Sequence, residues 1–366
     1  MRRLLILTSD TGEGHNSAAQ AIAEAARAAG YEVSVRKPLE ESTTLNRSLG
    51  QLYNLLLTHR PGWVGLFAWS VDCLGPNEAD FLYRRVTGYI RQFLDAERPD
   101  LVLSVHPMLN HMIQRWIVEQ HLGVPCYTLV TDPFPPFWRG WSSPYVDRYF
   151  VPTPEAGDEM VSRGVPAGTI ERVPMPVRAG FGRVSESEVD RLRASLGVDG
   201  DLILVNGGAR GGGPLRHLVR AVREEAPTSH VLVVCGHNQR VRKRLEQAGD
   251  PRVRTFGFVD NMHVLVGAAD LVITKPGALS TYEALAAAVP AVLTAIGGLM
   301  PQESGLFDAA RRLGFSFAVN TLDELRAVLR KGVSEWESRR QAISDFYRPG
   351  SSDDIVERIQ LAHAGR

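Results

Sequence analysis

Near the start of the chain, residues 8–19 read TSDTGEGHNSAA, and the apolar run LLIL comes directly before them. A short apolar run that breaks into a glycine-containing turn is typical of a buried strand, and the alanine-rich pattern that continues to Gly30 predicts a helix. Glycine lets a backbone approach a ligand closely, and the helix that follows presents free N–H groups and the positive end of its dipole. His15 supplies an imidazole in this turn. The stretch therefore predicts a polar ligand site with a base beside it.

The same order of strand, turn and helix is repeated along the chain. Strands are predicted at residues 3–8, 32–36, 101–105, 126–130 and 148–151, and after them at 202–206, 230–235, 253–256, 271–274 and 291–295. Helical patterns alternate with them at residues 18–29, 78–97, 109–121, 214–225, 239–248, 262–267, 280–288 and 302–313. Short apolar strands separated by helices imply parallel sheets that are covered on both faces, and ligands bind at the carboxyl ends of such strands.

We therefore expect an α/β protein with two doubly wound, Rossmann-like domains. The sequence VPMPV at residues 173–177 marks a connector, because two prolines fix an extended backbone. The first domain is expected at residues 1–176 and the second at 177–335, while residues 336–366 form a helical tail that is a candidate to pack back on the first domain. A chain of 366 residues exceeds the usual size of a single core, which agrees with this division.

Charge and cysteine content restrict the partners that we expect. The 41 basic and 41 acidic residues balance, so the overall charge gives no support to a nucleic-acid partner. Cys73, Cys126 and Cys235 are isolated and have no metal-binding spacing, which favours reduced thiols and a cytoplasmic location. No targeting segment or membrane span is evident, so any membrane contact should be peripheral.

A strand-to-helix junction rich in glycine stands in the second half. It reads NGGARGGGP at residues 206–214 and has five glycines in seven positions. Such a loop fits a nest of backbone N–H groups for an anion, with Gly207, Gly208 and Gly211 as candidates. A merely flexible loop is the alternative.

Two further junctions have the composition of ligand loops. The sequence TKPGALST at residues 274–281 offers a lysine, a glycine turn and hydroxyl groups at a helix N-terminus, which suits a diphosphate. Glu283 could accept hydrogen bonds from ribose hydroxyls, or could support the helix dipole from the surface. The sequence FGFVDNM at residues 256–262 could place a base against its backbone. A nicotinamide site is disfavoured, because Ser17 replaces the third glycine of GxGxxG, and the Walker pattern is absent.

Together these motifs carry a resemblance to a known family. In chain order they are GEGHNSAA at residues 12–19, residues 53–58, SVHP at 104–107, VTD at 130–132 with DRYFV at 147–151, CGHN at 235–238, residues 257–262, residues 273–283 and QE at 302–303. The chain resembles the monogalactosyldiacylglycerol synthases and processive diacylglycerol glucosyltransferases, which have the GT-B fold. Its donor loops are also similar to those of the related peptidoglycan N-acetylglucosaminyltransferase.

The resemblance implies a fold and an activity. The two Rossmann-like domains would face an interdomain cleft, and the second domain would hold a UDP-sugar. The enzyme would be an inverting, metal-independent hexosyltransferase that acts on a lipid hydroxyl, with diacylglycerol as the expected acceptor and no cofactor.

The resemblance also implies roles for individual residues. His15 would be the general base for the acceptor hydroxyl, with Asp132 as the competing carboxylate and Gly14 close to the reacting sugar. The other donor-binding residues follow in chain order. Phe258, Val259, Asn261 and Met262 would lie near uracil; Lys275, Gly277, Ala278, Leu279 and Ser280 near the diphosphate; Glu283 at the ribose; and Gln302 and Glu303 at the sugar hydroxyls.

Three departures from the family pattern concern the sugar and the acceptor. The interval PFPPF at residues 133–137 lacks a histidine that family members usually carry. The sequence PQESGL at residues 301–306 lacks a glycine and an asparagine, and Ala278 stands where a second glycine is usual.

Two aromatic stretches favour a membrane contact. Trp63 and Phe67 lie in the leucine-rich residues 52–74, and Phe137 and Trp138 lie in residues 133–141. Aromatic, basic and apolar residues together suit an interfacial segment, although packing in a core or a domain interface is the alternative. A position at the inner face of a membrane is therefore expected. The other functions that the sequence leaves open are a GT-B transferase with a non-lipid acceptor, a UDP-sugar epimerase, and a nucleotide-sugar-binding module without turnover.

Overall fold

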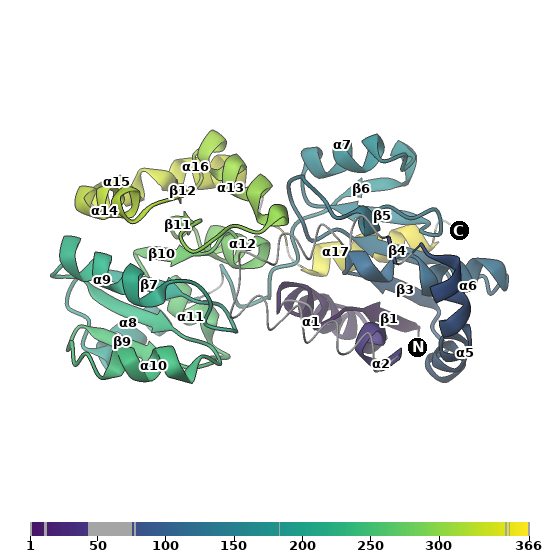
Figure 1. The fold of residues 1–366 in the computed structure, drawn as a ribbon, viewed down its shortest axis with the longest axis horizontal. Coiled ribbons are helices and arrows are strands. Elements are labelled where there is room, and N and C mark those ends of the chain that lie inside the picture. The colour runs from purple at the N-terminus through teal and green to yellow at the C-terminus, as the bar shows by residue number, and fades with distance from the viewer. Residues whose placement is uncertain are drawn as a thin grey trace. The chain divides into compact units, whose positions relative to one another are not determined.

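A computed structural model of the chain describes residues 2–10, 13–42, 75–76, 78–182, 184–347, 350 and 352–364. The chain divides into two compact units (Figure 1). The first unit contains Met1–Arg178 and Gly350–Arg366, and the second contains Ala179–Pro349. Both units are built on a parallel sheet, as the alternating pattern of the sequence predicts.

The first unit has a six-stranded sheet with the order β2-β1-β3-β4-β5-β6. Its strands are β1 (Arg3–Leu7), β2 (Glu32–Arg36), β3 (Leu101–Ser104), β4 (Cys126–Leu129), β5 (Arg148–Val151) and β6 (Ile170–Arg172). Leu5 of β1 pairs with Ser34 of β2 on one side and with Val102 of β3 on the other. The strand order therefore reverses at β1, and the carboxyl end of such a strand is where ligands bind in doubly wound sheets.

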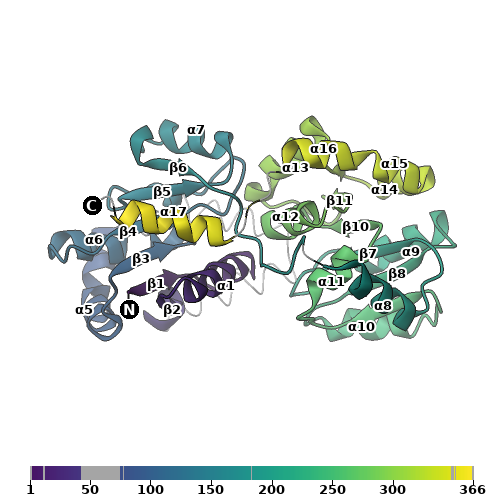
Figure 2. The ribbon, with the colours of Figure 1, turned by 180° about the vertical axis from the view of Figure 1, so that it is seen from behind.

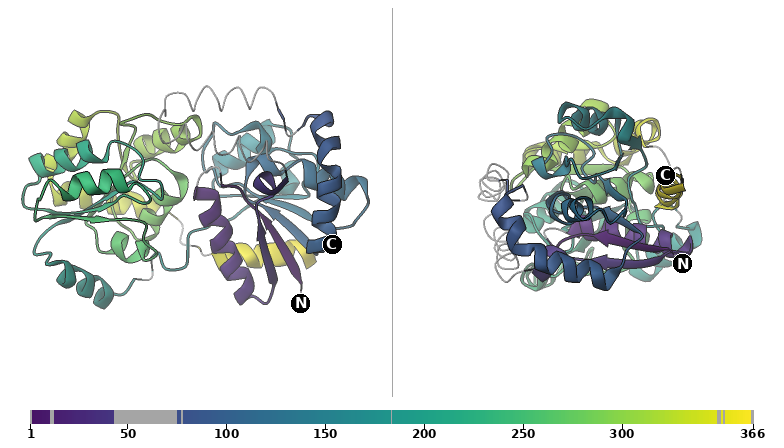
Figure 3. Two further views of the ribbon diagram at one scale, coloured as in Figure 1. Left: turned by 60° about the horizontal axis from the view of Figure 1, so that its bottom comes forward. Right: turned by 90° about the vertical axis from the view of Figure 1, so that its right-hand side faces the viewer.

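Helices cover both faces of this sheet. They are α1 (Glu13–Ala28), α2 (Pro38–Ser42), α5 (Asp80–Glu97), α6 (Met112–Glu119), α7 (Pro154–Ser162) and α17 (Ser352–Ala364), with the 3-10 turns η1 (Pro107–Leu109), η2 (Arg139–Trp141) and η3 (Ala167–Thr169). Side chains alternate along a strand, so Leu4 and Ile6 pack with α1 and α17, whereas Leu5 and Leu7 pack with α5 and α6. Figures 2 and 3 show α1 and α17 together on one side of the strands.

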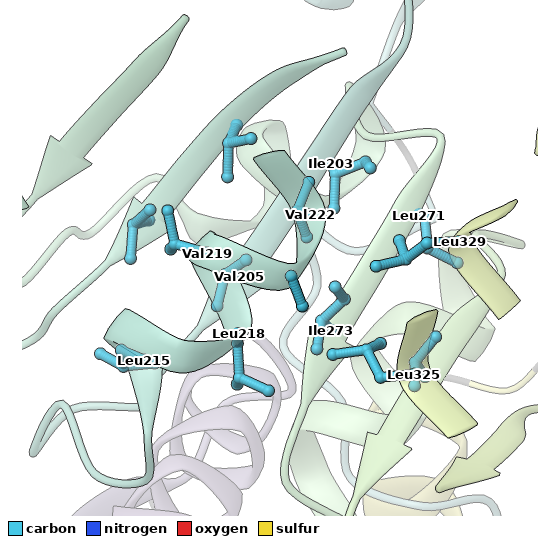
Figure 4. Packing of buried hydrophobic residues seen from close by; sticks show 14 of the residues in the cluster. Ile203, Val205, Leu215, Leu218, Val219, Val222, Leu271, Ile273, Leu325 and Leu329 are labelled. Carbon is cyan, nitrogen blue, oxygen red and sulfur yellow. The ribbon is translucent and has the colours of Figure 1, made fainter. Parts of the chain in front are cut away.

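The second unit repeats the architecture with the strand order β12-β11-β10-β7-β8-β9. Its strands are β7 (Leu202–Asn206), β8 (His230–Val234), β9 (Val253–Phe256), β10 (Leu271–Thr274), β11 (Ala291–Thr294) and β12 (Phe317–Val319). Its helices are α8 (Glu186–Leu196), α9 (Leu215–Glu225), α10 (Gln239–Glu246), α11 (Met262–Gly267), α12 (Ala278–Ala286), α13 (Pro301–Leu313), α14 (Leu322–Lys331), α15 (Val333–Glu337) and α16 (Arg339–Phe346). Figure 4 shows the apolar side chains of β7 and β10 packed under α9 and α14.

The tail of the chain differs from the expected helical segment 336–366. Trp336 of α15 is 1% exposed in the core of the second unit, and Phe346 of α16 stacks on Phe315 with ring centroids 4.1 Å apart. Only α17 belongs to the first unit, where Ile355 and Ile359 are fully buried in the cluster that includes α1. The apolar side chains of α15 and α16 therefore hold these helices to the second unit, and the tail is divided.

Two further properties concern only the residues that the structure describes. None of their helices is long and apolar enough to cross a membrane. Their His, Cys, Asp and Glu side chains form no group of three or more that could hold a metal ion.

Candidate functional site

A polar network connects the residues that follow β1 with the start of α1 and with α2. Ser9 Oγ and the Asp10 N–H both donate to Glu40 Oε1, at 2.7 and 2.8 Å. Asn16 Nδ2 donates to Asp10 Oδ1 at 3.0 Å, and Thr8 Oγ1 donates to Asn16 Oδ1 at 3.1 Å. The carboxyl end of β1, the start of α2 and the first turn of α1 are thereby tied together. This network sets the position of His15, in the first turn of α1.

The described residues give His15 two polar contacts, both at Nδ1. Nδ1 lies 2.8 Å from the carbonyl oxygen of Val105, just after β3, and 3.0 Å from Thr131 Oγ1, just after β4. A carbonyl oxygen can only accept, so Nδ1 carries the hydrogen and Nε2 keeps its lone pair. Three neighbouring strand ends thus hold the imidazole in the tautomer of a base.

Burial keeps this imidazole uncharged. It lowers the pKa of His15 to about 4, and the hydrogen bond to the Val105 carbonyl opposes the shift only in part. The charged form is disfavoured because it would lose its hydration in the protein interior. His15 is therefore neutral at pH 7 and can accept a proton there.

Asp132 lies near the same end of the sheet, but its carboxylate is engaged. Its Oδ2 accepts a hydrogen bond from Trp141 Nε1 at 2.7 Å, and Asp132 is 9% exposed. The Trp141 ring is fully buried, and its centroid lies 6.1 Å from that of His15. His15 and Asp132, the two predicted candidates for the base, thus both lie beside Trp141. The nitrogen that is available to accept a proton is His15 Nε2.

His106 is a neighbour of His15 to which sequence reasoning gave no role. It is 3% exposed, and its ring centroid lies 4.4 Å from that of His15 in an edge-to-face arrangement. Its position before Pro107 at the end of a predicted strand was the feature of the sequence that could have pointed to a place near the site. Gly14 precedes His15 in α1, and a Cβ built on it would meet no described atom within 4 Å, so packing does not require a glycine there.

The aromatic residues proposed for membrane contact fall into two groups. Phe137 is 5% exposed and belongs to a buried cluster with Val130 and Met160, and Trp138 packs against this cluster. The structure therefore favours the packing alternative for Phe137. Trp63 and Phe67 lie outside the described residues.

The glycine-rich loop after β7 is not an open nest at its first positions. The N–H groups of Gly207, Gly208, Gly211 and Gly212 donate to Val234 O, Asn206 Oδ1, Gly208 O and Gly207 O. These four donors are thus satisfied within the protein, and the expected anion nest is wrong for them. A Cβ on Gly211 would lie 1.9 Å from the Cys235 carbonyl oxygen, so close packing against the turn before α10 requires this glycine.

The N-terminus of α12 offers a better anion site. No side chain caps the helix, which leaves first-turn N–H groups for a ligand, and Ser280 Oγ donates to Gly277 O at 3.3 Å. The Lys275 ammonium lies beside the glycine-rich loop, because a Cβ on Gly212 would be 3.5 Å from its Nζ. Ala278 is half-buried, and Leu279 is buried in the first turn. A lysine and a free helix terminus therefore converge on one edge of the sheet.

Glu283 lies one turn further along α12. It is 7% exposed, so it is not the surface residue of the alternative interpretation. Its side chain is therefore shielded from solvent one turn beyond the start of α12.

The junction between β9 and α11 presents an exposed aromatic pair. Phe258 is 54% exposed and stacks on His237, with centroids 5.0 Å apart and planes within 6°. Val259 is half-buried and Asn261 is exposed, but Met262 is 7% exposed and faces the core. A flat aromatic surface is thus available at this junction, and its His237 partner was not predicted.

Two polar side chains stand at the N-terminus of α13. Glu303 Oε2 accepts a hydrogen bond from the Met300 N–H at 3.0 Å, and burial raises the pKa of the Glu303 carboxyl. Gln302 Oε1 is buried and has no hydrogen-bond partner among the described residues. A buried acceptor without a donor is a site that a ligand hydroxyl can satisfy.

Two family models match the chain in order. The model of monogalactosyldiacylglycerol (MGDG) synthase matches residues 15–177, and that of the glycosyltransferase family 28 C-terminal domain matches residues 202–297. The first match covers the strand ends around His15, and the second covers the α12 edge.

Curated relatives match both halves of the chain. A probable monogalactosyldiacylglycerol synthase 2, chloroplastic, of Oryza sativa subsp. japonica is 30% identical over 322 residues, which are 80% of this chain and 66% of the relative. The chain thus spans slightly less than two thirds of that plant protein. A processive diacylglycerol beta-glucosyltransferase of Bacillus cereus is 26% identical over 98% of this chain and 93% of the relative.

Solved structures agree with the fold. MurG of Acinetobacter baumannii superimposes with a TM-score of 0.63 at 16% identity, covering 99% of this chain and all of that one. Anabaena HepE in complex with UDP gives a TM-score of 0.60 at 15% identity and covers all of both chains. These neighbours support the GT-B fold that the two Rossmann-like sheets indicate. With both halves matched in order and a relative aligned along nearly its whole length, the chain belongs to the family of monogalactosyldiacylglycerol synthases and processive diacylglycerol glucosyltransferases.

Proposed function

We propose that the protein transfers a hexose from a UDP-sugar to a hydroxyl of diacylglycerol, with inversion at the anomeric carbon and without a metal ion. The observation that carries the proposal is the geometry of His15, whose Nδ1 is held 2.8 Å from the Val105 carbonyl while Nε2 keeps its lone pair. An alcohol that attacks an anomeric carbon must lose its proton, and a neutral imidazole can accept it. The relatives, a monogalactosyldiacylglycerol synthase and a diacylglycerol glucosyltransferase, support diacylglycerol as the acceptor.

The proposed reaction is a single displacement. The acceptor oxygen forms a bond to the anomeric carbon while the bond from that carbon to the β-phosphate oxygen breaks. The acceptor proton passes to His15 Nε2, and the bond electrons leave with UDP. An attack opposite the leaving group inverts the configuration of the sugar.

The leaving UDP gains negative charge, which must be stabilised as it develops. We assign this role to the uncapped N-terminus of α12 and to Lys275, because both present positive charge at one edge of the sheet. Since protein groups supply this charge, the proposed mechanism calls for no metal ion and no cofactor.

The remaining donor contacts follow the polar groups at the same edge. The exposed face of Phe258 suits the uracil ring, and the buried Glu283 carboxylate suits the ribose hydroxyls. No described residue donates to Gln302 Oε1, so we propose that a sugar hydroxyl does so. Because diacylglycerol resides in bilayers, we also propose that the protein works at the cytoplasmic face of a membrane, bound peripherally.

The test combines product formation with donor binding. Purified protein, UDP-glucose or UDP-galactose, and vesicles that contain diacylglycerol should yield hexosyl-diacylglycerol, detected by mass spectrometry. His15→Ala should bind UDP with unchanged affinity in calorimetry but lose about 100-fold or more in kcat, as expected for a general base. His217→Ala is the matched control, because His217 is an exposed imidazole on α9. Full activity of His15→Ala would remove His15 from the base role.

The stereochemistry gives an independent result. A β-linked product from the α-linked donor supports the single displacement. An α-linked product would contradict it, and Asp132→Asn would then test whether that carboxylate acts as a second nucleophile.

A further inference from the structure

In the motif SVHP at residues 104–107, the Val105 carbonyl orients His15 in the proposed reaction, but the histidine of the motif has no part in it. This histidine, His106, lies between β3 and η1 and is 3% exposed. The ring of His106 meets that of His15 with centroids 4.4 Å apart and planes at 68°. A buried imidazole in ring contact with the proposed base calls for a physical reason.

The hydrogen bonds of His106 fix both its orientation and its tautomer. His106 Nδ1 accepts a hydrogen bond from the Met108 N–H at 3.2 Å and thereby caps η1. Ser104 Oγ donates to the His106 carbonyl at 3.1 Å. A nitrogen that accepts cannot carry the hydrogen, so the neutral ring is protonated on Nε2. A flip of the ring would break the cap, so the side chain is held in one orientation.

The hydrogen bonds of His15 leave the plane of its ring free to tilt, and His106 can restrict this tilt. Both polar contacts of His15 are at Nδ1, to Val105 and Thr131, so they fix one corner of the ring and not its plane. The plane depends on what packs on the ring, and the described residues place two rings there, with the centroid of His106 at 4.4 Å and that of Trp141 at 6.1 Å. Trp141 is itself held by Asp132.

We propose that His106 is a positioning residue for His15: its locked, uncharged ring fixes the plane of the His15 imidazole and keeps water from it, so that Nε2 stays directed and unprotonated. The inference rests on the proposed role of His15 as the base. It adds a residue from the end of β3 that touches neither reacting atom.

The surroundings of His15 favour two uncharged rings. Within the described part of the chain, His106 is the titratable side chain in ring contact with His15, Asp132 lies behind Trp141, and Thr131 contributes a neutral hydroxyl. Burial lowers the pKa of His106 well below its ordinary value, and the charge of a protonated His15 would lower it further. A contact between two neutral rings thus preserves the base at ordinary pH.

Two substitutions separate the ring contact from the cap. His106→Asn keeps an acceptor for the Met108 N–H but removes the ring, whereas His106→Phe keeps a ring but removes the acceptor. The first readout is a nitrogen NMR titration of the His15 imidazole in the free protein, assigned by its absence in His15→Ala. The second is kcat at pH 7, with UDP affinity and melting temperature as checks that each variant is folded.

We expect His106→Asn to admit water, to raise the pKa of His15 from about 4 toward its ordinary 6.5, and to lower kcat about tenfold or more with unchanged UDP affinity. His106→Phe should leave the His15 pKa low and keep kcat closer to the wild type. Its melting temperature should fall, because η1 loses its cap.

Two results would overturn the proposal. If both variants leave the His15 titration and kcat unchanged, His106 only fills space. If His106→Phe impairs both as much as His106→Asn, the ring contact is not what matters. The NMR titration needs no substrate, so it can succeed even if His15→Ala retains transfer, which would refute only the base role.

Discussion

At the scale of single residues, the direction of one hydrogen bond determines what His15 can do. The Val105 carbonyl accepts from Nδ1, which leaves the lone pair on Nε2, and burial keeps the ring uncharged. An exposed histidine at the same position would be about half protonated near pH 6.5 and would lose half of its capacity as a base there.

The lowered pKa of His15 predicts the acid limb of the pH–rate profile. The base works only when neutral, and its pKa is lowered to about 4, so kcat/KM should stay level as the pH falls from 8 to about 5 and decline only toward 4. The measurement is kcat/KM over this range, with samples returned to pH 7.5 to exclude irreversible loss. An acid limb centred near 6.5 would mean that the base is solvated or is another residue.

Substitution of Lys275 should weaken binding of the UDP-sugar donor without disturbing the structure. Replacing it by methionine keeps the length of the side chain and removes the charge, so UDP affinity should fall about 10- to 100-fold, as for one charge-assisted hydrogen bond. Lys243→Met is the control, because Lys243 is an exposed lysine of the same unit on α10. Calorimetric UDP binding measures both variants, and an equal affinity for the two would exclude Lys275 from the diphosphate site.

At the scale of elements, the strand-to-helix junctions differ in whether their polar groups bond within the protein or are available to a ligand. The glycine-rich loop after β7 crosses the turn before α10 so closely that Asn238 Nδ2 donates to Gly211 O at 3.0 Å. The N-terminus of α12, in contrast, has no side-chain cap. The first junction is closed by its own hydrogen bonds, and the second is open to a ligand.

This contrast predicts different costs for two similar substitutions. Gly208 and Gly211 both have positive φ, at 66° and 60°, but only at Gly211 would a Cβ collide, 1.9 Å from the Cys235 carbonyl oxygen. Gly208→Ala should cost about 1 kcal/mol from backbone strain, and Gly211→Ala about 3 kcal/mol because overpacking is added. Thermal melting of the two variants compares them directly. Equal melting temperatures would contradict the close packing of this loop.

The junctions also show how far sequence reasoning reaches. Strand ends and ligand loops were predictable because apolar runs, glycines and helix starts are local signals. The satisfied N–H group of Gly207 was not, because its partner, the Val234 carbonyl, lies on β8. Strand β6 was also missed, since its three residues IER are only partly buried and carry no apolar run.

At the scale of the whole molecule, the path of the chain explains why the sequence alone did not assign every segment to its unit. The connector near residue 176 was visible from its prolines, and the observed division follows Arg178. The return of α17 to the first unit depends on Ile355 and Ile359 meeting α1, a contact between the two ends of the chain. His106 was overlooked for the same reason, since its contact with His15 joins β3 to α1.

Three histidines with lowered pKa values predict that the first unit loses stability in acid. His15, His106 and His111 all have a pKa below its ordinary value because of burial. Between the folded values and about 6.5 the unfolded chain binds more protons, so the free energy of unfolding should decrease as the pH falls through this window. For His15 alone the decrease is of the order of 3 kcal/mol between pH 6.5 and 4.

Urea unfolding from pH 7.5 to 4 measures this dependence. His15→Gln should show a shallower decline than the wild type, because one lowered pKa is removed. A free energy of unfolding that stays constant between pH 6.5 and 4.5 would contradict the buried, neutral state of these rings.

The most direct test of the whole account is a screen of donors against acceptors. UDP-glucose, UDP-galactose and UDP-N-acetylglucosamine are each mixed with diacylglycerol vesicles or with soluble alcohols and sugars, and products are identified by mass spectrometry. We expect hexosyl-diacylglycerol from a UDP-hexose, formed only when His15 is present. Transfer to a soluble acceptor with none to diacylglycerol, or conversion of the UDP-sugar to its epimer without transfer, would contradict this expectation.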